Sequence, residues 1–164
     1  MQGGFLAAGQ RVEQQFADVA RRRGWQCNTA TRDQDMNEHW DVRIVNHESN
    51  LCVDVKSRKK ISRAASAAQD TWVWIELHSV RPDDAGWLYG YADLVAFERL
   101  HDFVLVERER LVRLVEELVP PTAPFASYPA AARYKLYARE GRADILTLIE
   151  MSCVEVIAWA IWNK

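Results

Sequence analysis

Two regular spacings of apolar residues predict a helix followed by a β-hairpin. Between residues 10 and 23 the apolar side chains recur three and four positions apart, as on one face of a helix, and Gly24 follows where a helix cap is expected. Residues 40–45 and 51–56 are rich in β-branched side chains and lie on either side of a polar turn. The sequence therefore predicts an amphipathic helix and then two antiparallel strands.

The rest of the pattern predicts further strands and helices within one domain, residues 1–164. Strand-like runs cover residues 71–77, 87–91, 94–97 and 145–151, and a charged amphipathic helix covers residues 107–119. Residues 31–38 are polar and predict a loop. Ser152 and Glu155 have the spacing of a capping box, which predicts a last helix that carries Trp159 and Trp162. Because strands and helices are mixed along the chain, we expect an α/β fold.

Acidic and basic side chains gather on the predicted hairpin. Asp54 and Lys56 are two positions apart on the second strand and project from one face, and Asp41 lies on the first strand beside them. Two carboxylates held close together repel each other unless a cation or a proton intervenes. Mg²⁺ suits such a pair, because it binds through one or two carboxylates and takes further ligands from water and phosphate. A lysine beside the ion can orient an attacking water or stabilise charge on the phosphate.

These residues, with twelve positions between Asp41 and the Asp54-Val55-Lys56 motif, resemble the PD-(D/E)XK nuclease superfamily. The resemblance implies a restriction-endonuclease-like fold, in which helices flank a central mixed β-sheet. It also implies that Asp41, Asp54 and the backbone carbonyl of Val55 bind Mg²⁺ or Mn²⁺. Lys56 is then expected to assist the attacking water.

The resemblance covers about residues 9–77, and Trp40 stands where the family name has proline. Many members carry a glutamate on the helix before the hairpin, which Glu13 matches, so Glu13 is expected to complete the catalytic and metal-binding set. The implied activity is that of a metal-dependent deoxyribonuclease, a hydrolase acting on phosphodiester bonds in DNA. The sequence leaves RNA open as a substrate, and a homodimer is compatible with the two-fold symmetry of a DNA duplex.

Composition indicates an ordered, nearly neutral protein with one concentrated basic segment. Hydrophobic residues make up 49% of the 164 positions, and 21 basic against 23 acidic residues give a net charge of −2. Neither a uniformly basic nucleic-acid coat nor an acidic disordered tail has this composition. Affinity for DNA must therefore be local. The residues expected to bind the nucleic-acid backbone follow directly after the lysine of the motif, and they are Ser57, Arg58, Lys59, Lys60 and Arg63.

The cysteines and the longest apolar stretch predict a cytoplasmic protein without a membrane span. Cys27, Cys52 and Cys153 are too scattered for a disulfide framework or a zinc knuckle. The most apolar stretch, residues 145–162, contains two glutamates, whereas a membrane span is almost free of charge. Two other functions remain compatible with the sequence. One is a nucleic-acid-binding module of the same fold without activity, and the other is a scaffold that presents its tryptophan-rich and leucine-rich faces to a protein partner.

Overall fold

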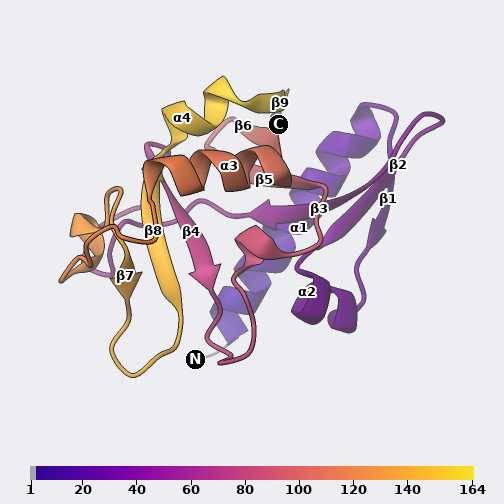
Figure 1. Cartoon of the computed structure of the whole chain (residues 1–164). Coiled ribbons are helices and arrows are strands. Elements are labelled where there is room, and N and C mark those ends of the chain that lie inside the picture. Colours follow the sequence, from indigo (N-terminus) through magenta and orange to yellow (C-terminus); the bar gives the residue numbers. More distant parts are fainter. Residues whose placement is uncertain (1–2) are drawn as a thin grey trace. The chain divides into compact units, whose positions relative to one another are not determined.

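A six-stranded mixed sheet with a long helix against it forms the first of two compact units in the computed structural model (Figure 1). The structure describes residues 3–164, with side chains from residue 8 onward. The first unit contains the described residues up to Ser57, Tyr91–Arg108 and Ala158–Lys164, and the second contains Arg58–Gly90 and Glu109–Ile157. The structure is thus a mixed α/β fold, as the sequence predicts. A single domain over residues 1–164 stays a prediction.

The sheet of the first unit is antiparallel except at one central pair. Its strands are β1 (Gln26–Thr29), β2 (Val42–Val45), β3 (Asn50–Lys56), β5 (Leu94–Glu98), β6 (Asp102–Glu107) and β9 (Ala158–Asn163). The helices of the same unit are α1 (Gly3–Arg22) and α2 (Arg32–Glu38). The strand order is β1-β2-β3-β5-β6-β9. Only β3 and β5 are parallel. This pair places the end of β3, which carries the predicted motif, at the centre of the sheet.

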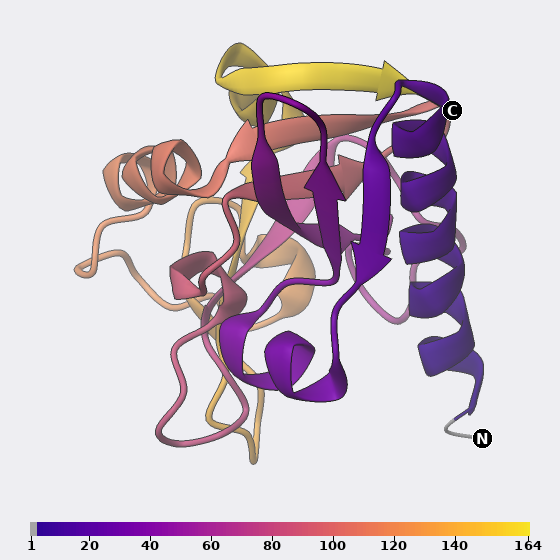
Figure 2. The same cartoon turned by 90° about the vertical axis from the view of Figure 1, so that its right-hand side faces the viewer.

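The predicted first helix is confirmed, and it covers one face of this sheet (Figure 2). The apolar residues of α1 at helical spacing are buried in one core with inward-facing residues of the strands. Phe16 lies edge-on to Phe103, with ring centroids 5.4 Å apart, and stacks on Trp162 at 5.8 Å. Gly24, at φ 86°, provides the left-handed residue that ends the helix. The core therefore fixes α1 against the strands that carry the motif.

The predicted hairpin is also confirmed, as β2 and β3. Val42 lies opposite Val53, and both are buried in the core under α1, together with Val55. Because side chains alternate along a strand, Asp54 and Lys56 project from the opposite face. The packing of the valines thus determines which face presents the charged side chains.

The polar segment 31–38 is a helix, α2, rather than the predicted loop. Thr31 and Gln34 form a capping box, in which the Thr31 side chain accepts from the Gln34 N–H at 3.3 Å and the Gln34 side chain accepts from the Thr31 N–H at 2.9 Å. None of the residues of α2 is buried, so no apolar periodicity marked the helix in the sequence. The capping residues were the available signal.

Replacing Thr31 with Ala should lower the free energy of unfolding by about 0.5–2 kcal/mol, because one helix donor loses its acceptor. Urea unfolding followed by circular dichroism measures the change. Thr122→Ala, at an exposed threonine in a turn, is the matched control and should change stability by less than about 0.5 kcal/mol. Equal effects of the two substitutions would show that the capping box contributes nothing.

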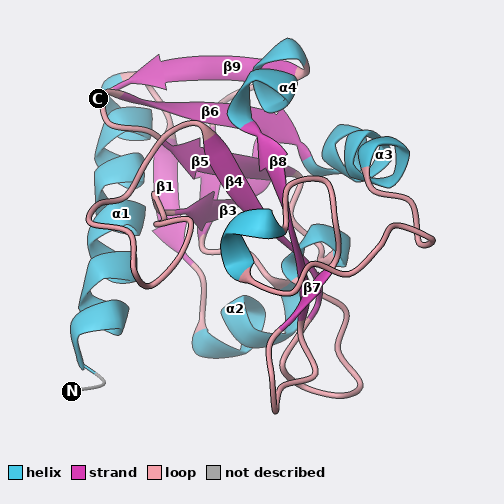
Figure 3. Cartoon of the chain, turned by 90° about the vertical axis from the view of Figure 1, so that its left-hand side faces the viewer, coloured by secondary structure: helices cyan, strands magenta, loops and turns pink. Residues whose placement is uncertain are grey.

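The second unit is built on a small antiparallel sheet (Figure 3). Its elements are β4 (Trp72–His78), η1 (Trp87–Tyr89), α3 (Arg108–Leu118, in this unit from Glu109), η2 (Pro129–Ala131), β7 (Tyr137–Ala138), β8 (Ile145–Glu150) and α4 (Met151–Val156). The strand order is β4-β8-β7. The chain passes so close to β4 at Gly86 that a Cβ there would lie 2.1 Å from the Glu76 carbonyl oxygen. Only glycine fits this position.

Further elements differ from the sequence prediction. Residues 87–91 do not form a strand, because Trp87–Tyr89 is a short 3₁₀ helix between two glycines. The predicted last helix ends early: α4 stops at Val156, and Trp159 and Trp162 lie on the strand β9. The strands β1, β6 and β7 were not predicted. Among the described residues, no helix has the length and apolar character needed to cross a membrane.

Candidate functional site

Asp41 lies in the first unit directly before β2, where it is tied to two neighbouring segments. Its N–H donates to the Val53 carbonyl of β3 at 2.9 Å, and its carbonyl accepts from the Ala30 N–H at 2.7 Å. The preceding Trp40 is buried, and its indole N–H donates to the Glu38 carboxylate at 2.6 Å. The backbone that carries the Asp41 carboxyl group is therefore held on both sides. Trp40 anchors this turn by packing.

The Asp41 side chain reaches across to β3 and meets the predicted motif. Its Oδ2 accepts a hydrogen bond from the Val55 N–H at 2.7 Å. On the same strand, Lys56 Nζ lies 2.7 Å from Asp54 Oδ1. The structure thus brings together the three charged side chains that the sequence singles out, on two adjacent strands.

One oxygen of this group has no partner. The Asp54 side chain is 3% exposed, and its Oδ2 is buried without a hydrogen-bond partner. Buried carboxylate oxygens are normally paired, because leaving such an atom unsatisfied costs about 1–3 kcal/mol or more. Lys56, by contrast, is 27% exposed at its side chain and reaches toward solvent. Because the Asp41 and Asp54 carboxyl groups also interact with each other, a proton or a cation shared by the two acids would satisfy this oxygen.

Burial raises the pKa values of both acids, and the charge of Asp54 raises that of Asp41 further. The pKa of Asp41 is raised to about 7, first because the carboxyl group is buried and then because Asp54 lies beside it, while Lys56 and the Val55 N–H act in the opposite direction. Burial also raises the pKa of Asp54, and the nearby Lys56 ammonium opposes this. With a pKa of about 7, Asp41 is therefore partly protonated near neutral pH in the absence of another cation.

Two more carboxyl groups approach the pair from the helices of the same unit. Glu13 of α1 has its pKa raised to about 7, chiefly by burial and then by the charges of Asp41 and Asp35. Asp35 of α2 also raises the pKa of Asp54. Glu13 was predicted for the site, whereas Asp35 was not, because its segment was interpreted as a loop. Four carboxyl groups thus influence one another around a single ammonium, that of Lys56.

The donor set fits a hard divalent cation bound mainly by the two strand acids. Among the described residues, no three His, Cys, Asp or Glu side chains are arranged to hold a metal ion together. Mg²⁺, however, needs only one or two carboxylates from the protein and completes its shell with water and phosphate. Asp41 and the unpaired oxygen of Asp54 meet that requirement. Glu13 lies close enough to Asp41 for the charge of Asp41 to raise its pKa, and the role of Glu13 as a ligand stays a prediction, as does that of the Val55 carbonyl.

The predicted nucleic-acid-binding residues divide between the two units. Ser57 belongs to the first unit, and Arg58, Lys59, Lys60 and Arg63 belong to the second. Arg58 is half-buried and forms an ion pair with Asp70 at 2.5 Å, so its guanidinium helps to hold its own loop. Lys59, Lys60 and Arg63 are exposed. The part of this segment best placed to meet a phosphate is therefore its exposed lysine and arginine side chains.

The raised pKa of Asp41 predicts that the metal-free protein loses stability as pH rises. A carboxyl group whose pKa is 3.8 unfolded and about 7 folded binds its proton more tightly when folded. Its stabilising contribution is complete below about pH 4 and is lost as pH rises through 7. Between about pH 5 and pH 8, wild type should therefore lose of the order of 2 kcal/mol more unfolding free energy than Asp41→Asn, which cannot ionise. Urea unfolding in EDTA at both pH values measures this difference, and parallel curves for the two proteins would contradict it.

Comparisons of the chain with protein-family models, with curated proteins and with solved structures find no match.

Proposed function

We propose that this protein is a Mg²⁺- or Mn²⁺-dependent nuclease of the restriction-endonuclease-like fold, which hydrolyses phosphodiester bonds in DNA. The observation that carries the proposal is the convergence of Asp41, Asp54 and Lys56 at the hairpin, with one buried Asp54 oxygen left without a partner. Two close carboxylates with one lysine are suited to bind a divalent cation and a phosphate together.

The architecture of the first unit supports this proposal. The PD-(D/E)XK resemblance implies a helix packed on a central mixed sheet, with the acidic motif and the Asp-x-Lys motif on the two strands of a hairpin. The first unit has α1 on a mixed six-stranded sheet, with Asp41 at the start of β2 and Asp54 and Lys56 on β3. These features of the fold are compatible with the proposed family.

Each side chain of the site has a role in the proposed reaction. Asp41, Asp54 and the Val55 carbonyl would hold the cation, which when bound supplies Lewis-acid polarisation of the phosphate and a more acidic water. Asp41 is kept in place for this by its bond from the Val55 N–H. Water attacks phosphorus, the bond from phosphorus to the leaving sugar oxygen breaks, and the leaving oxygen takes up a proton.

Lys56 and Glu13 would act on charge and protons during that attack. The Lys56 ammonium is held next to Asp54 and is partly exposed, so it can approach the phosphate oxygens and stabilise the negative charge that builds on them. Glu13, with its pKa raised to about 7, is suited to accept the proton of the attacking water near neutral pH. The acids are therefore divided between holding the cation and moving a proton.

Incubation of the purified protein with linear, circular and branched DNA tests the proposal. We expect cleavage in Mg²⁺ or Mn²⁺ and none in EDTA, with the DNA form that is cut distinguishing endonuclease from exonuclease activity. Intact DNA in every metal-containing reaction would contradict the proposed function.

A further inference from the structure

The small sheet of the second unit presents a half-buried aromatic face along β4. Trp72 and Trp74 point to one side of the strand, while Val73 and Ile75 are buried on the other. The ring of Trp72 lies edge-on to Tyr134 at 5.7 Å, and that of Trp74 lies 6.1 Å from Tyr137. Neither tryptophan is fully buried. Part of this aromatic layer therefore remains open to solvent.

The basic segment after the hairpin is fixed against this same face. The Trp74 indole N–H donates to the Lys60 carbonyl at 3.1 Å. The Gln69 side-chain amide donates both to the Lys59 carbonyl at 3.1 Å and to the Trp72 carbonyl at 2.8 Å. These bonds hold the backbone of residues 59–60 beside the start of β4. The Lys60 side chain is exposed beside the tryptophans.

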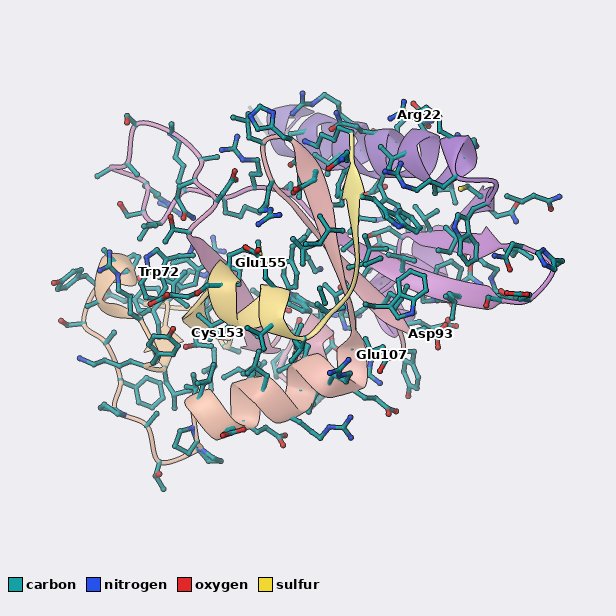
Figure 4. All side chains as sticks on the ribbon, turned by 90° about the horizontal axis from the view of Figure 1, so that it is seen from above. Arg22, Trp72, Asp93, Glu107, Cys153 and Glu155 are labelled. Atoms are coloured by element: carbon teal, nitrogen blue, oxygen red, sulfur yellow. The ribbon has the colours of Figure 1, made fainter. Side chains whose placement is uncertain are left out.

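A second basic segment covers the ring of Trp72, at the start of β4. The Arg133 guanidinium carbon lies 4.7 Å above the centre of the Trp72 ring, and Arg133 is exposed. Figure 4 labels Trp72 among the side chains of this region. Lys135, which follows Tyr134 in the sequence, is also exposed. A guanidinium already ordered on a ring loses little side-chain freedom when a further flat group stacks on it.

The charge of this surface is positive within a chain whose net charge is −2. The exposed cations of the two segments are Lys59, Lys60, Arg63, Arg133 and Lys135. The acids on or beside this face all have partners: Asp70 is paired with Arg58, Glu76 accepts from the Trp87 N–H, and Glu150 accepts from the Ser152 hydroxyl. The cations therefore outnumber the acids that remain to balance them, which is the complement of a phosphate backbone.

We propose that this aromatic and basic surface of the second unit binds single-stranded nucleic acid. Lys60, Arg63 and Lys135 contact the phosphates, and an unpaired base stacks on Arg133, which itself lies on Trp72. A single strand is favoured over a duplex because stacking on the guanidinium requires a base face that is not already covered by a neighbouring base pair. Binding at this surface does not depend on cleavage at the hairpin site.

The test is fluorescence anisotropy of labelled oligonucleotides of about 12 nucleotides, a length within the range of known single-strand binding sites, in EDTA. The probes are oligo(dT), oligo(U) and a DNA duplex, titrated with the full-length protein between about 50 and 200 mM salt. Binding of oligo(dT) or oligo(U) should be tighter than binding of the duplex. The two single-stranded probes show whether deoxyribose or ribose is preferred.

Three variants separate the stacking from the charge. Arg133→Ala should weaken single-strand binding about 5- to 50-fold and reduce the salt slope by about one. Arg133→Lys keeps the charge but has no planar face, so it should keep the salt slope and lose the preference for single strands. Arg22→Ala, at an exposed arginine of α1 that Figure 4 also labels, is the matched control and should bind as wild type does. Circular dichroism of each variant checks folding.

Equal affinity of wild type for single strands and duplex, no binding at low salt, or equal effects of Arg133→Ala and Arg22→Ala would each overturn the proposal. If this surface binds an acidic protein instead of nucleic acid, the oligonucleotides should not bind at low salt. That result would also overturn the proposal. Cleavage assays test the hairpin site separately, because the anisotropy is measured in EDTA, where no cleavage is expected. Single-strand binding by a protein that cleaves nothing would leave this proposal standing and refute the nuclease.

Discussion

Asp54→Asn is expected to abolish metal-dependent DNA cleavage while the protein stays folded. The substitution keeps the size of the side chain but removes the charge of the group whose Oδ2 is buried without a partner. The site then loses half of its strand carboxylates, so we expect a loss of about 10⁴-fold or more, as when a member of a catalytic unit is removed. Supercoiled plasmid in Mg²⁺ or Mn²⁺ measures the rate, and circular dichroism confirms the fold.

The sheet itself provides a matched control for this substitution. Glu98 on β5 is also a buried acid paired with a lysine, with Lys164 Nζ 2.8 Å from its Oε1. Glu98→Gln removes a carboxylate of similar burial, so any loss of cleavage that comes only from disturbing the sheet should appear in both variants. Cleavage by Asp54→Asn at the rate of Glu98→Gln would refute the assignment of the site.

Lys56→Met should reduce cleavage by about 10²- to 10³-fold, because the phosphate loses one preorganised positive group. The methionine fills a similar volume but leaves Asp54 without its 2.7 Å ion pair. Since the lysine competes with a cation for that carboxylate, binding of Mn²⁺ should persist, whereas Asp54→Asn should lose it. The increase in melting temperature on adding Mn²⁺ measures binding, and the plasmid assay measures the rate.

Lys164→Met, which removes the lysine partner of the buried Glu98, is the control for this second substitution and should retain cleavage. A Lys56→Met protein that cleaves as fast as the control would mean that the ammonium plays no part in the reaction. A protein that loses Mn²⁺ binding as well would mean that Lys56 acts by holding the carboxylates in place rather than on the phosphate.

The convergence of the strand residues could be predicted because strand periodicity is a local property. Val53 and Val55 had to face the core, which placed Asp54 and Lys56 together on the other face. The position of Asp41 followed from the pairing of two adjacent strands across a short turn. The spacing alone, however, gave no information on the burial of Asp54 or on its unpaired oxygen.

Other parts of the site and the fold depend on tertiary contacts that no local pattern reports. Asp35 reaches the site because residues 31–38 form a helix stabilised by a capping box and not by apolar packing. The strand β9 was predicted as helix from a capping-box pattern. Residues 158–163 instead pair with β6, and their side chains alternate between buried or half-buried positions and exposed ones. The parallel pairing of β3 with β5 passes over the intervening β4, so it is a non-local choice of partner.

The sequence indicated only separate parts of the proposed surface for single-stranded nucleic acid, and not their association. The basic residues after Lys56 were expected to bind DNA, whereas residues 71–77 were predicted only as a strand. Their association depends on hydrogen bonds from Gln69 and Trp74 to the backbone of the basic segment. Contacts of side chains with a distant backbone leave no periodic signal in a sequence.

Anomalous diffraction from crystals soaked in Mn²⁺ measures most directly whether the two strand acids form a cation site. We predict one strong peak between the carboxyl groups of Asp41 and Asp54, present at neutral pH and absent from crystals of Asp54→Asn. A map with no peak at this position, or carboxyl groups that lie too far apart to share an ion, would contradict the proposed catalytic centre.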